Sequence, residues 1–353
     1  MSEKGNGIIC RYDFIVNKTG RAKGATLLDT DKGYYLLREF KGTKKHLEFE
    51  EDLLNRLSEN ESIKVEQIVR DSDGNLINES DDGRKYVMHK WCASKDLEQK
   101  DTMLLIKAAG VLGKLHLLMN EMAYDMKYLN ECFNIQESYR QLKPEFDKHN
   151  KEMKRTRTFI RDKRRKNEFE LLILSSFDKF YQDGIEVEEQ MHNERIHEFI
   201  DDSMRLGRII HGAYNYHNIV VTGNRLMVTN FEHCKCGIQI RDLYDFMRKV
   251  MEKHSWNRDL GMKLLNEYRR NREITAEEFK YLILKFKYPE KYWKILNHYN
   301  NNNKAWIPDK DVIKLKSVIE HQDRRRDFIN SLLIILLFFL TLLDEYYIIN
   351  RIM

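Results

Sequence analysis

Two patterns of apolar residues divide the chain. In the first part, short apolar runs at residues 26–28, 33–40, 63–69 and 85–91 are separated by turns rich in Asp, Ser and Gly. Such runs predict strands. Leucines recur at helical spacing over residues 46–57, and a Thr three residues earlier can cap that helix. This part of the sequence therefore predicts a small sheet with one helix packed on it.

Apolar residues at helical spacing dominate from residue 96 onwards. They predict helices over residues 103–119, 151–174 and 187–210, and a further series from residue 242 to about residue 321. A strand, a Thr-Gly-Asn turn and a second strand interrupt the helices at residues 219–229. This interruption predicts a hairpin inside a helical region.

The change of pattern places a boundary near residues 92–95. We expect three parts. These are a small N-terminal α+β lobe over residues 1–92, a large helical lobe over residues 93–328 and an apolar tail over residues 329–353.

Composition narrows the class of protein. Of the 353 residues, 42% are hydrophobic and 33% are charged, and only three are proline, which is typical of a folded, helix-rich protein. The net charge of +5 gives no global argument for binding nucleic acid. The five cysteines form no CxxC pair, which argues against a disulfide framework and a zinc site. The polar N-terminus lacks the apolar segment of a secretory signal, so we expect a cytosolic protein.

The hairpin region carries the candidate chemistry. Residues 211–218 have the sequence His-Gly-Ala-Tyr-Asn-Tyr-His-Asn, and Asn-Phe-Glu follows the second strand at residues 230–232. In phosphotransferases of the protein kinase type, a loop Asp accepts the proton of the attacking hydroxyl. An Asn five residues later and an Asp after a short hairpin hold the metal ions. The spacing follows because the base must reach the hydroxyl while both metal ligands converge on one phosphate.

This layout resembles the aminoglycoside phosphotransferase and choline kinase superfamily, whose loop begins His-Gly-Asp and ends in Asn. His211, Gly212 and Asn218 match that pattern. Ala213 stands at the position of the catalytic Asp, and Asn230 stands at the position of the metal-binding Asp. The resemblance implies an α+β, two-lobed protein kinase-like fold with a small antiparallel sheet lobe and a large helical lobe.

The same resemblance implies roles for further residues. Arg38 takes the place of the Lys that pairs with the nucleotide phosphates, and Glu48, Glu50 or Glu51 on the next helix would be its ion-pair partner. Asp242 matches the acidic residue that braces the catalytic loop. ATP and Mg²⁺ would be the cofactors if any activity remains, with Asn218 and Asn230 at degenerate Mg²⁺ positions. The candidate cofactor-binding residues are Arg38, Glu48, Glu51, Asn218, Asn230 and Glu232.

Longer matches resemble one branch of the superfamily, the CotS family of spore coat proteins. They lie at residues 231–234, 237–249, 254–256, 288–293 and 303–308. This resemblance implies a role in sporulation, a location in the mother-cell cytoplasm and incorporation into the spore coat. Other coat proteins would then be its partners.

The two replacements leave two hypotheses. Ala213 cannot accept a proton, and loss of a positioned base costs about 10²–10⁴-fold in rate. Asn230 offers a neutral oxygen where Mg²⁺ favours carboxylate. The favoured hypothesis is a catalytically disabled kinase fold with a structural or interaction role. The alternative is an active small-molecule or sugar phosphotransferase that recruits Glu232 or Asp242 as a substitute carboxylate.

Three smaller features bear on this choice. Residues 20–24, Gly-Arg-Ala-Lys-Gly, are either a flexible turn between strands or a degenerate phosphate-binding loop. We expect His211 to bond the backbone of its own loop. We expect His116 to pack within its helix and not to bind a metal ion.

Two outlying segments suggest partners. Nine basic residues lie between Lys151 and Lys166, and this segment either docks on an acidic partner or polyanion or is a solvated helix. No specific nucleic acid is expected. The apolar run at residues 331–343 has thirteen residues, fewer than the roughly 20 that span a bilayer. We favour docking on the helical lobe or self-association over membrane insertion.

Overall fold

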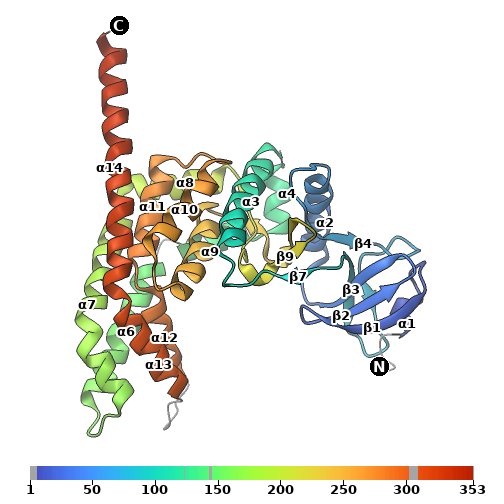
Figure 1. Cartoon of the computed structure of the whole chain (residues 1–353), viewed down its shortest axis with the longest axis horizontal. Coiled ribbons are helices and arrows are strands. Elements are labelled where there is room, and N and C mark those ends of the chain that lie inside the picture. Colours follow the sequence, from blue (N-terminus) through green and yellow to red (C-terminus); the bar gives the residue numbers. More distant parts are fainter. Residues whose placement is uncertain (1–5, 123, 143–144, 302–308, 353) are drawn as a thin grey trace. The chain divides into compact units, whose positions relative to one another are not determined.

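The computed structural model describes residues 6–122, 124–142, 145–301 and 309–352 (Figure 1). The chain forms two compact units. The first unit comprises Met1–Asn134, Gly207–Asp242 and Glu267–Arg272, and the second comprises Ile135–Leu206, Leu243–Asn266 and Glu273–Met353.

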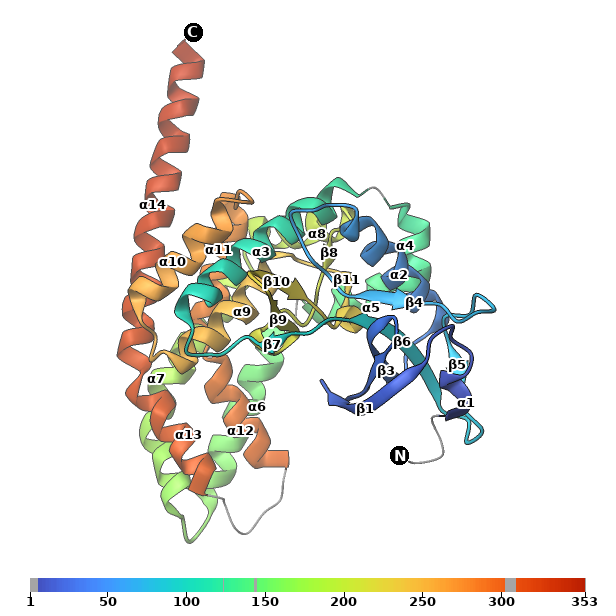
Figure 2. The same cartoon turned by 45° about the vertical axis from the view of Figure 1, so that its right-hand side comes forward.

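An antiparallel sheet forms the N-terminal part of the first unit. Its strand order is β1-β2-β3-β6-β4, with β5 also paired to β6 (Figure 2). Side chains alternate between the two faces of these strands, and Leu28, Leu36 and Met88 are fully buried. The strands are β1 (Val16–Ala22), β2 (Ala25–Thr30), β3 (Gly33–Phe40), β4 (Gln67–Val69), β5 (Asn78–Glu79) and β6 (Lys85–Trp91), and a short helix, α1 (Asn6–Ile9), precedes them.

One amphipathic helix, α2 (Lys44–Ser58), packs on this sheet. Thr43 caps it by accepting a hydrogen bond from the backbone N–H of His46 at 3.2 Å. Leu47, Leu53, Leu54 and Leu57 are buried along one face, as their helical spacing predicts. Burying each of these leucines contributes about 1.5–3 kcal/mol.

The rest of the first unit contains helices and two small sheets. Helix α3 (Thr102–Glu121) is capped by Asp101, which accepts from Leu104 N at 3.0 Å. The expected hairpin is present as β9 (Ile219–Thr222) and β10 (Arg225–Val228), and β7 (Lys95–Asp96) pairs with β9. Further elements are α4 (Met126–Cys132), β8 (Ile209–Ile210), β11 (Lys235–Cys236) and two 3₁₀ turns, η2 (Tyr216–Asn218) and η3 (Phe231–His233).

Helix α3 is also the single helix among the described residues that could cross a membrane, judged by length and composition alone. Half of that stretch is buried inside the fold, which is equally typical of a core helix. Gly113 in this helix lies against the chain at Tyr268, where a Cβ would come within 2.6 Å of the backbone oxygen. The glycine therefore permits a close approach of the two segments.

The second unit is built from helices. Helix α9 (Ile240–Lys253) begins in the first unit and continues in the second. Helix α10 (Arg258–Arg269) begins in the second unit and ends in the first. The others are α5 (Ile135–Leu142), α6 (Glu145–Asp162), α7 (Glu168–Met191), α8 (Glu194–Arg205), α11 (Ala276–Lys287), α12 (Glu290–Asn301), α13 (Asp309–Glu320) and α14 (Gln322–Ile352).

The predicted helices over residues 151–174 and 187–210 were wrong in their bounds. The chain leaves the first helix after Asp162 and starts α7 at a capping box, in which Asn167 and Glu170 bond each other's backbone N–H. The second predicted helix is divided by another cap, Asn193, which starts α8. Local caps thus override the apolar periodicity at both places.

The apolar tail continues α14, which packs against α11 within the second unit (Figure 1). Phe328 and Leu332 are fully buried. Ile334 and Phe338, further along, are 56% and 65% exposed. The N-terminal part of the helix therefore belongs to the core, and self-association of its remainder stays a prediction.

Candidate functional site

The loop at His211 is held by one buried carboxylate. Asp242, at the start of α9, accepts hydrogen bonds from the backbone N–H of His211 at 2.7 Å and of Gly212 at 3.0 Å. Asp242 is 2% exposed, so these bonds lie in the core. The carboxylate fixes the backbone just before position 213.

Two further side chains complete this support. The Nε2 atom of His116, on α3, lies 3.3 Å from Asp242, and its Nδ1 atom lies 2.8 Å from the Tyr268 hydroxyl. Burial alone would raise the pKa of Asp242, but the hydrogen bonds from the His116 side chain and the His211 backbone help to hold it below its usual value. We call His116, His211, Asp242 and Tyr268 the loop brace.

His211 bonds the backbone of its own region. Its Nε2 atom lies 3.1 Å from the carbonyl oxygen of Thr229, and its Nδ1 atom accepts from Ala213 N at 3.2 Å. Complete burial lowers the pKa of His211, which favours the neutral ring that this pattern requires. The structure places His211 as a structural residue of the loop.

The loop conformation requires glycine at position 212. Its φ of 72° lies in the left-handed region, and a Cβ there would sit 2.2 Å from the carbonyl oxygen of His233. Any side chain at this position would push two backbone segments apart. The His-Gly pair of the motif therefore specifies the shape of the loop.

Two amide side chains, those of Asn215 and Asn218, form hydrogen bonds across the rest of the loop. The carbonyl oxygen of Ala213 accepts from Asn215 Nδ2 at 2.8 Å and from Asn218 Nδ2 at 2.9 Å. The Tyr214 hydroxyl donates to the carbonyl oxygen of Ala108 at 2.7 Å. Ala213 itself is half-buried and adds only a methyl group. The structure brings Ala213 and Asn218 together, as the motif predicts.

A residue that sequence reasoning missed holds Asn230. The Oε1 atom of buried Glu66 accepts from the backbone N–H of Asn230, and it also accepts from Phe231 N at 3.3 Å. Asn230 adopts the left-handed conformation, with φ 67° and ψ 62°, which Asn tolerates better than most residues. A lone Glu in the apolar run of residues 63–69 was the signal that could have revealed it.

Arg38 is also paired with Glu66. Its Nη1 atom lies 3.3 Å from Glu66 Oε2, and His89 Nδ1 lies 3.5 Å from the same oxygen. Burial lowers the pKa of His89 to about 4 despite the nearby carboxylate. Arg38, Glu50, Glu66 and His89 form what we call the Glu66 cluster.

The three predicted partners of Arg38 have different surroundings. Glu48 pairs with Lys44 at 3.6 Å, and Glu51 pairs with Arg70 at 2.5 Å. Glu50 is buried, and desolvation, strengthened by the charge of Glu66, raises its pKa to about 8 against the opposing effect of Arg38. Of the three, only Glu50 joins the Glu66 cluster.

Residues 20–22 end strand β1, and Lys23 and Gly24 form the tight turn to β2. Lys23 and Gly24 have φ values of 51° and 75°, as in a two-residue hairpin turn. The Nζ atom of Lys23 donates to the carbonyl oxygen of His217 at 2.7 Å and lies 2.5 Å from Asp96. This turn is thus tied to the loop that carries Asn218.

The two candidate substitute carboxylates differ in access. Asp242 is buried, and both its oxygens accept hydrogen bonds within the loop brace. The side chain of Glu232 is 58% exposed and lies 3.3 Å from His233 Nε2. Of the pair, Glu232 alone can reach a bound molecule without dismantling the loop.

An antiparallel sheet with one packed helix, a braced His-Gly loop and a following hairpin define a protein with the aminoglycoside phosphotransferase form of the kinase-like fold. An aminoglycoside phosphotransferase from Alicyclobacillus acidocaldarius subsp. acidocaldarius DSM 446 has a similar structure, with a TM-score of 0.81 at 15% identity over 94% of this chain and 96% of that one. The chain belongs to the family described as spore coat putative kinase YutH, which matches residues 6–332. The predicted fold and the resemblance to spore coat proteins are confirmed.

A kinase and a further phosphotransferase are similar at lower scores. The amicoumacin kinase hAmiN, in complex with AMP-PNP, Ca²⁺ and Ami, gives a TM-score of 0.59 at 12% identity, with 92% of each chain covered. The spectinomycin phosphotransferase APH(9)-Ia, bound to AMP, gives 0.60 at 12% identity over 90% of this chain and 96% of that one. At such identities the likeness establishes the fold alone. A search of curated proteins finds no match to the chain.

Proposed function

We propose that this member of the spore coat kinase family is catalytically disabled and serves as a structural or interaction protein of the coat. One observation carries the proposal. The loop brace keeps the backbone of a phosphotransferase centre in place, while Ala213 and Asn230 stand where that chemistry needs carboxylates.

The loss at position 213 concerns proton transfer. A positioned base contributes about 10²–10⁴-fold to a rate. The methyl group of Ala213 has no proton acceptor, and the nearby amides of Asn215 and Asn218 donate to the Ala213 carbonyl oxygen. These amides hold the loop closed and offer no basic group in place of the missing carboxylate.

The loss at position 230 concerns the metal ion. Mg²⁺ prefers carboxylate oxygens, and metal ions supply most of the charge stabilisation in phosphoryl transfer. Asn218 and Asn230 provide two neutral amides, and the Asn218 amide already donates to Ala213. This donor set does not fit a Mg²⁺ site of the phosphotransferase class.

The alternative function depends on one residue. An active phosphotransferase would need a substitute carboxylate, and the exposed Glu232 is the candidate with access to a bound molecule. Asp242 cannot serve without giving up its bonds to His211 and Gly212. Glu232 therefore separates the two functions experimentally.

Membership of the spore coat family supports incorporation into the coat from the mother-cell cytoplasm, with other coat proteins as partners. The basic segment expected to meet an acidic partner or polyanion lies at the end of α6 and in the turn after it. Lys151, Lys154, Arg155, Arg164 and Arg165 are exposed there. Their exposure supports an interaction role for this segment.

The decisive experiment is ATP binding and turnover by the purified full-length protein. Calorimetry with ATP, with and without Mg²⁺, should give no Mg²⁺-dependent binding, and no phosphate release should be detected above the buffer rate. Robust Mg²⁺-dependent turnover that Glu232→Gln abolishes would overturn the proposal in favour of the active phosphotransferase. Glu194→Gln, which changes an exposed carboxylate at the start of α8, is the matched control.

A further inference from the structure

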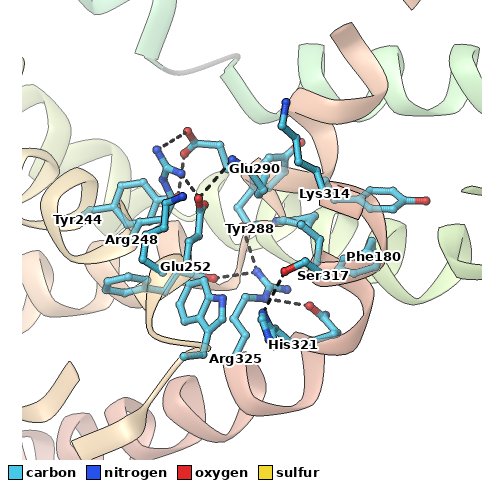
Figure 3. Close-up of a pocket in the computed structure, with 18 of the residues that line it drawn as sticks. Phe180, Tyr244, Arg248, Glu252, Tyr288, Glu290, Lys314, Ser317, His321 and Arg325 are labelled. Atoms are coloured by element: carbon cyan, nitrogen blue, oxygen red, sulfur yellow. Dashed lines mark hydrogen bonds and ion pairs between the residues drawn. The ribbon is translucent and has the colours of Figure 1, made fainter. Parts of the chain in front are cut away.

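A cavity of about 250 Å³ lies wholly within the second unit, away from the residues discussed so far. It is formed by side chains of α7, α9, α11, α12, α13 and α14. Figure 3 shows Arg248 and Glu252 on one side and Ser317 and His321 on the other. Its volume is near the lower end for pockets that hold small organic molecules.

One wall of the cavity is aromatic. The ring centroids of Tyr244 and Phe286 are 5.1 Å apart, and those of Trp256 and Phe286 are 6.2 Å apart, both edge to face. Ser255 and Trp256 both have positive φ, at 51° and 56°, an unfavourable conformation for residues other than Gly. This backbone, fixed by a 2.8 Å bond from Trp256 N to Met251 O, places the indole at the cavity.

The two carboxylates that line the cavity, Glu252 and Glu290, already have hydrogen-bond and ion-pair partners. Glu252 accepts from Arg248 Nη1 at 2.6 Å, and its other oxygen lies 3.4 Å from Lys291. Glu290 accepts from the Tyr244 hydroxyl at 2.7 Å, and it also pairs with Lys294. Burial would raise the pKa of Glu290, but Lys285, Arg248 and Lys294 together hold it well below its usual value. Both carboxylates are therefore already paired with basic side chains.

Cationic groups remain at the cavity. Lys291 and Lys314 each have one acidic partner, Glu252 at 3.4 Å and Asp311 at 3.0 Å, and an ammonium group can donate three hydrogen bonds. Lys253 also lines the cavity and is exposed. The side chains of Lys291 and Lys314 are 40% and 53% exposed, so both can reorient toward a ligand.

Arg325 also lines the cavity, but its guanidinium group is bonded within the protein. Its guanidinium pairs with Asp183 at 2.7 Å and donates to the carbonyl oxygens of Phe286 and Tyr288 at the end of α11. Arg325 therefore forms part of the cavity wall and caps the C-terminal end of α11. Lys291 and Lys314 are the basic groups that can contact a ligand.

We propose that this cavity binds a small organic anion with a flat apolar body, of the class of aromatic carboxylates or aryl phosphates. The ring would lie against Tyr244, Trp256 and Phe286, and the anionic group would meet Lys291 and Lys314. The proposal is independent of whether the loop at Ala213 supports catalysis, since none of the cavity residues belongs to that loop.

Calorimetric titration of the full-length protein tests this. Benzoate and phenyl phosphate, used separately, should bind saturably in the millimolar range, whereas neutral benzyl alcohol should bind at least tenfold more weakly. Comparing the first two probes distinguishes carboxylate from phosphate recognition. No saturable binding of either anion, or equal binding of benzyl alcohol, overturns the proposal.

Two variants place the binding in this cavity. Lys291→Gln combined with Lys314→Gln should weaken anion binding at least tenfold, whereas Lys310→Gln, an exposed lysine one turn earlier on α13 that does not line the cavity, should leave it unchanged. Ser317→Phe, which fills the space, should abolish it. Unchanged affinity in the double variant, or in Ser317→Phe, would also overturn the proposal.

Discussion

The loop brace and the reactive positions Ala213 and Asn230 belong to the same candidate site but differ in burial. His116, His211 and Asp242 are almost wholly buried and are bonded to one another or to the loop backbone. Ala213 and Asn230 are half-buried. Removing a buried hydrogen-bonding group leaves its partners unpaired, whereas replacing a group that faces solvent costs little folding energy. A mutation that removes the loop brace therefore costs folding stability, whereas a mutation that removes the carboxylates of the site costs little.

The Glu66 cluster extends the same comparison. Glu66 holds the backbone N–H groups of Asn230 and Phe231 and pairs with Arg38, all with a side chain closed to solvent. The turn at Asn230 is thus held by a protein carboxylate behind it. Its geometry does not depend on the residue type at position 230, beyond tolerance of positive φ.

The largest effect is expected from Asp242→Ala. It removes the acceptor of His211 N and Gly212 N and leaves His116 without a carboxylate partner in the core. We expect a loss of about 3–5 kcal/mol in the free energy of unfolding, measured by urea denaturation. Asp259→Asn, an exposed carboxylate on α10, is the control and should stay within about 0.5 kcal/mol. Equal stability of Asp242→Ala and the wild type would show that the loop brace does not stabilise the fold.

A pH-dependent effect of intermediate size is expected at Glu50. Its pKa rises from 4.5 to about 8 on folding, chiefly through burial. Between these values the native state holds a proton that the unfolded state has released, so stability falls as pH rises from about 5 through about 8. Glu50→Gln stays neutral and should gain about 1–3 kcal/mol over the wild type between pH 5 and pH 8.

Urea midpoints at four pH values measure that difference. The low pKa of His89 imposes the opposite slope below pH 6.5, but it is common to both proteins and cancels in the comparison. Glu48→Gln on the same helix, a half-buried residue that pairs with Lys44 at 3.6 Å, should follow the wild type. A parallel pH profile for Glu50→Gln and the wild type would show that Glu50 is charged in the folded protein.

The smallest effect on stability is expected from restoring the carboxylates, Ala213→Asp together with Asn230→Asp. Both positions are half-buried, and Asp tolerates positive φ much as Asn does, so the change should stay within about 1 kcal/mol. If the brace has preserved the geometry, Mg²⁺ with ATP should stabilise this variant in thermal unfolding and should not stabilise the wild type. A destabilisation of several kcal/mol would show that the side chains at positions 213 and 230 also contribute to the stability of the loop.

Two features of the fold show where sequence reasoning stopped. The break after Asp162 carries a local signal, because Asn167 and Glu170 have the spacing of a capping box, but the apolar periodicity on either side concealed it. The partner of Arg38 had no local signal of comparable strength. Glu48, Glu50 and Glu51 lie on the expected helix, yet Glu66 makes the ion pair.

The sequence by itself determined strands β2, β3 and β6 of the sheet, the leucine face of α2, the His-Gly loop and the absence of carboxylates at positions 213 and 230, but it missed β1 and β5. These depend on spacing along the chain and on residue type, both of which are local. Only the tertiary structure decided that Glu66 reaches Asn230, 164 residues away, and that Glu66, not a glutamate of α2, pairs with Arg38. Chain spacing cannot rank several carboxylates of equal chemistry, because burial and long-range packing determine which one meets the backbone.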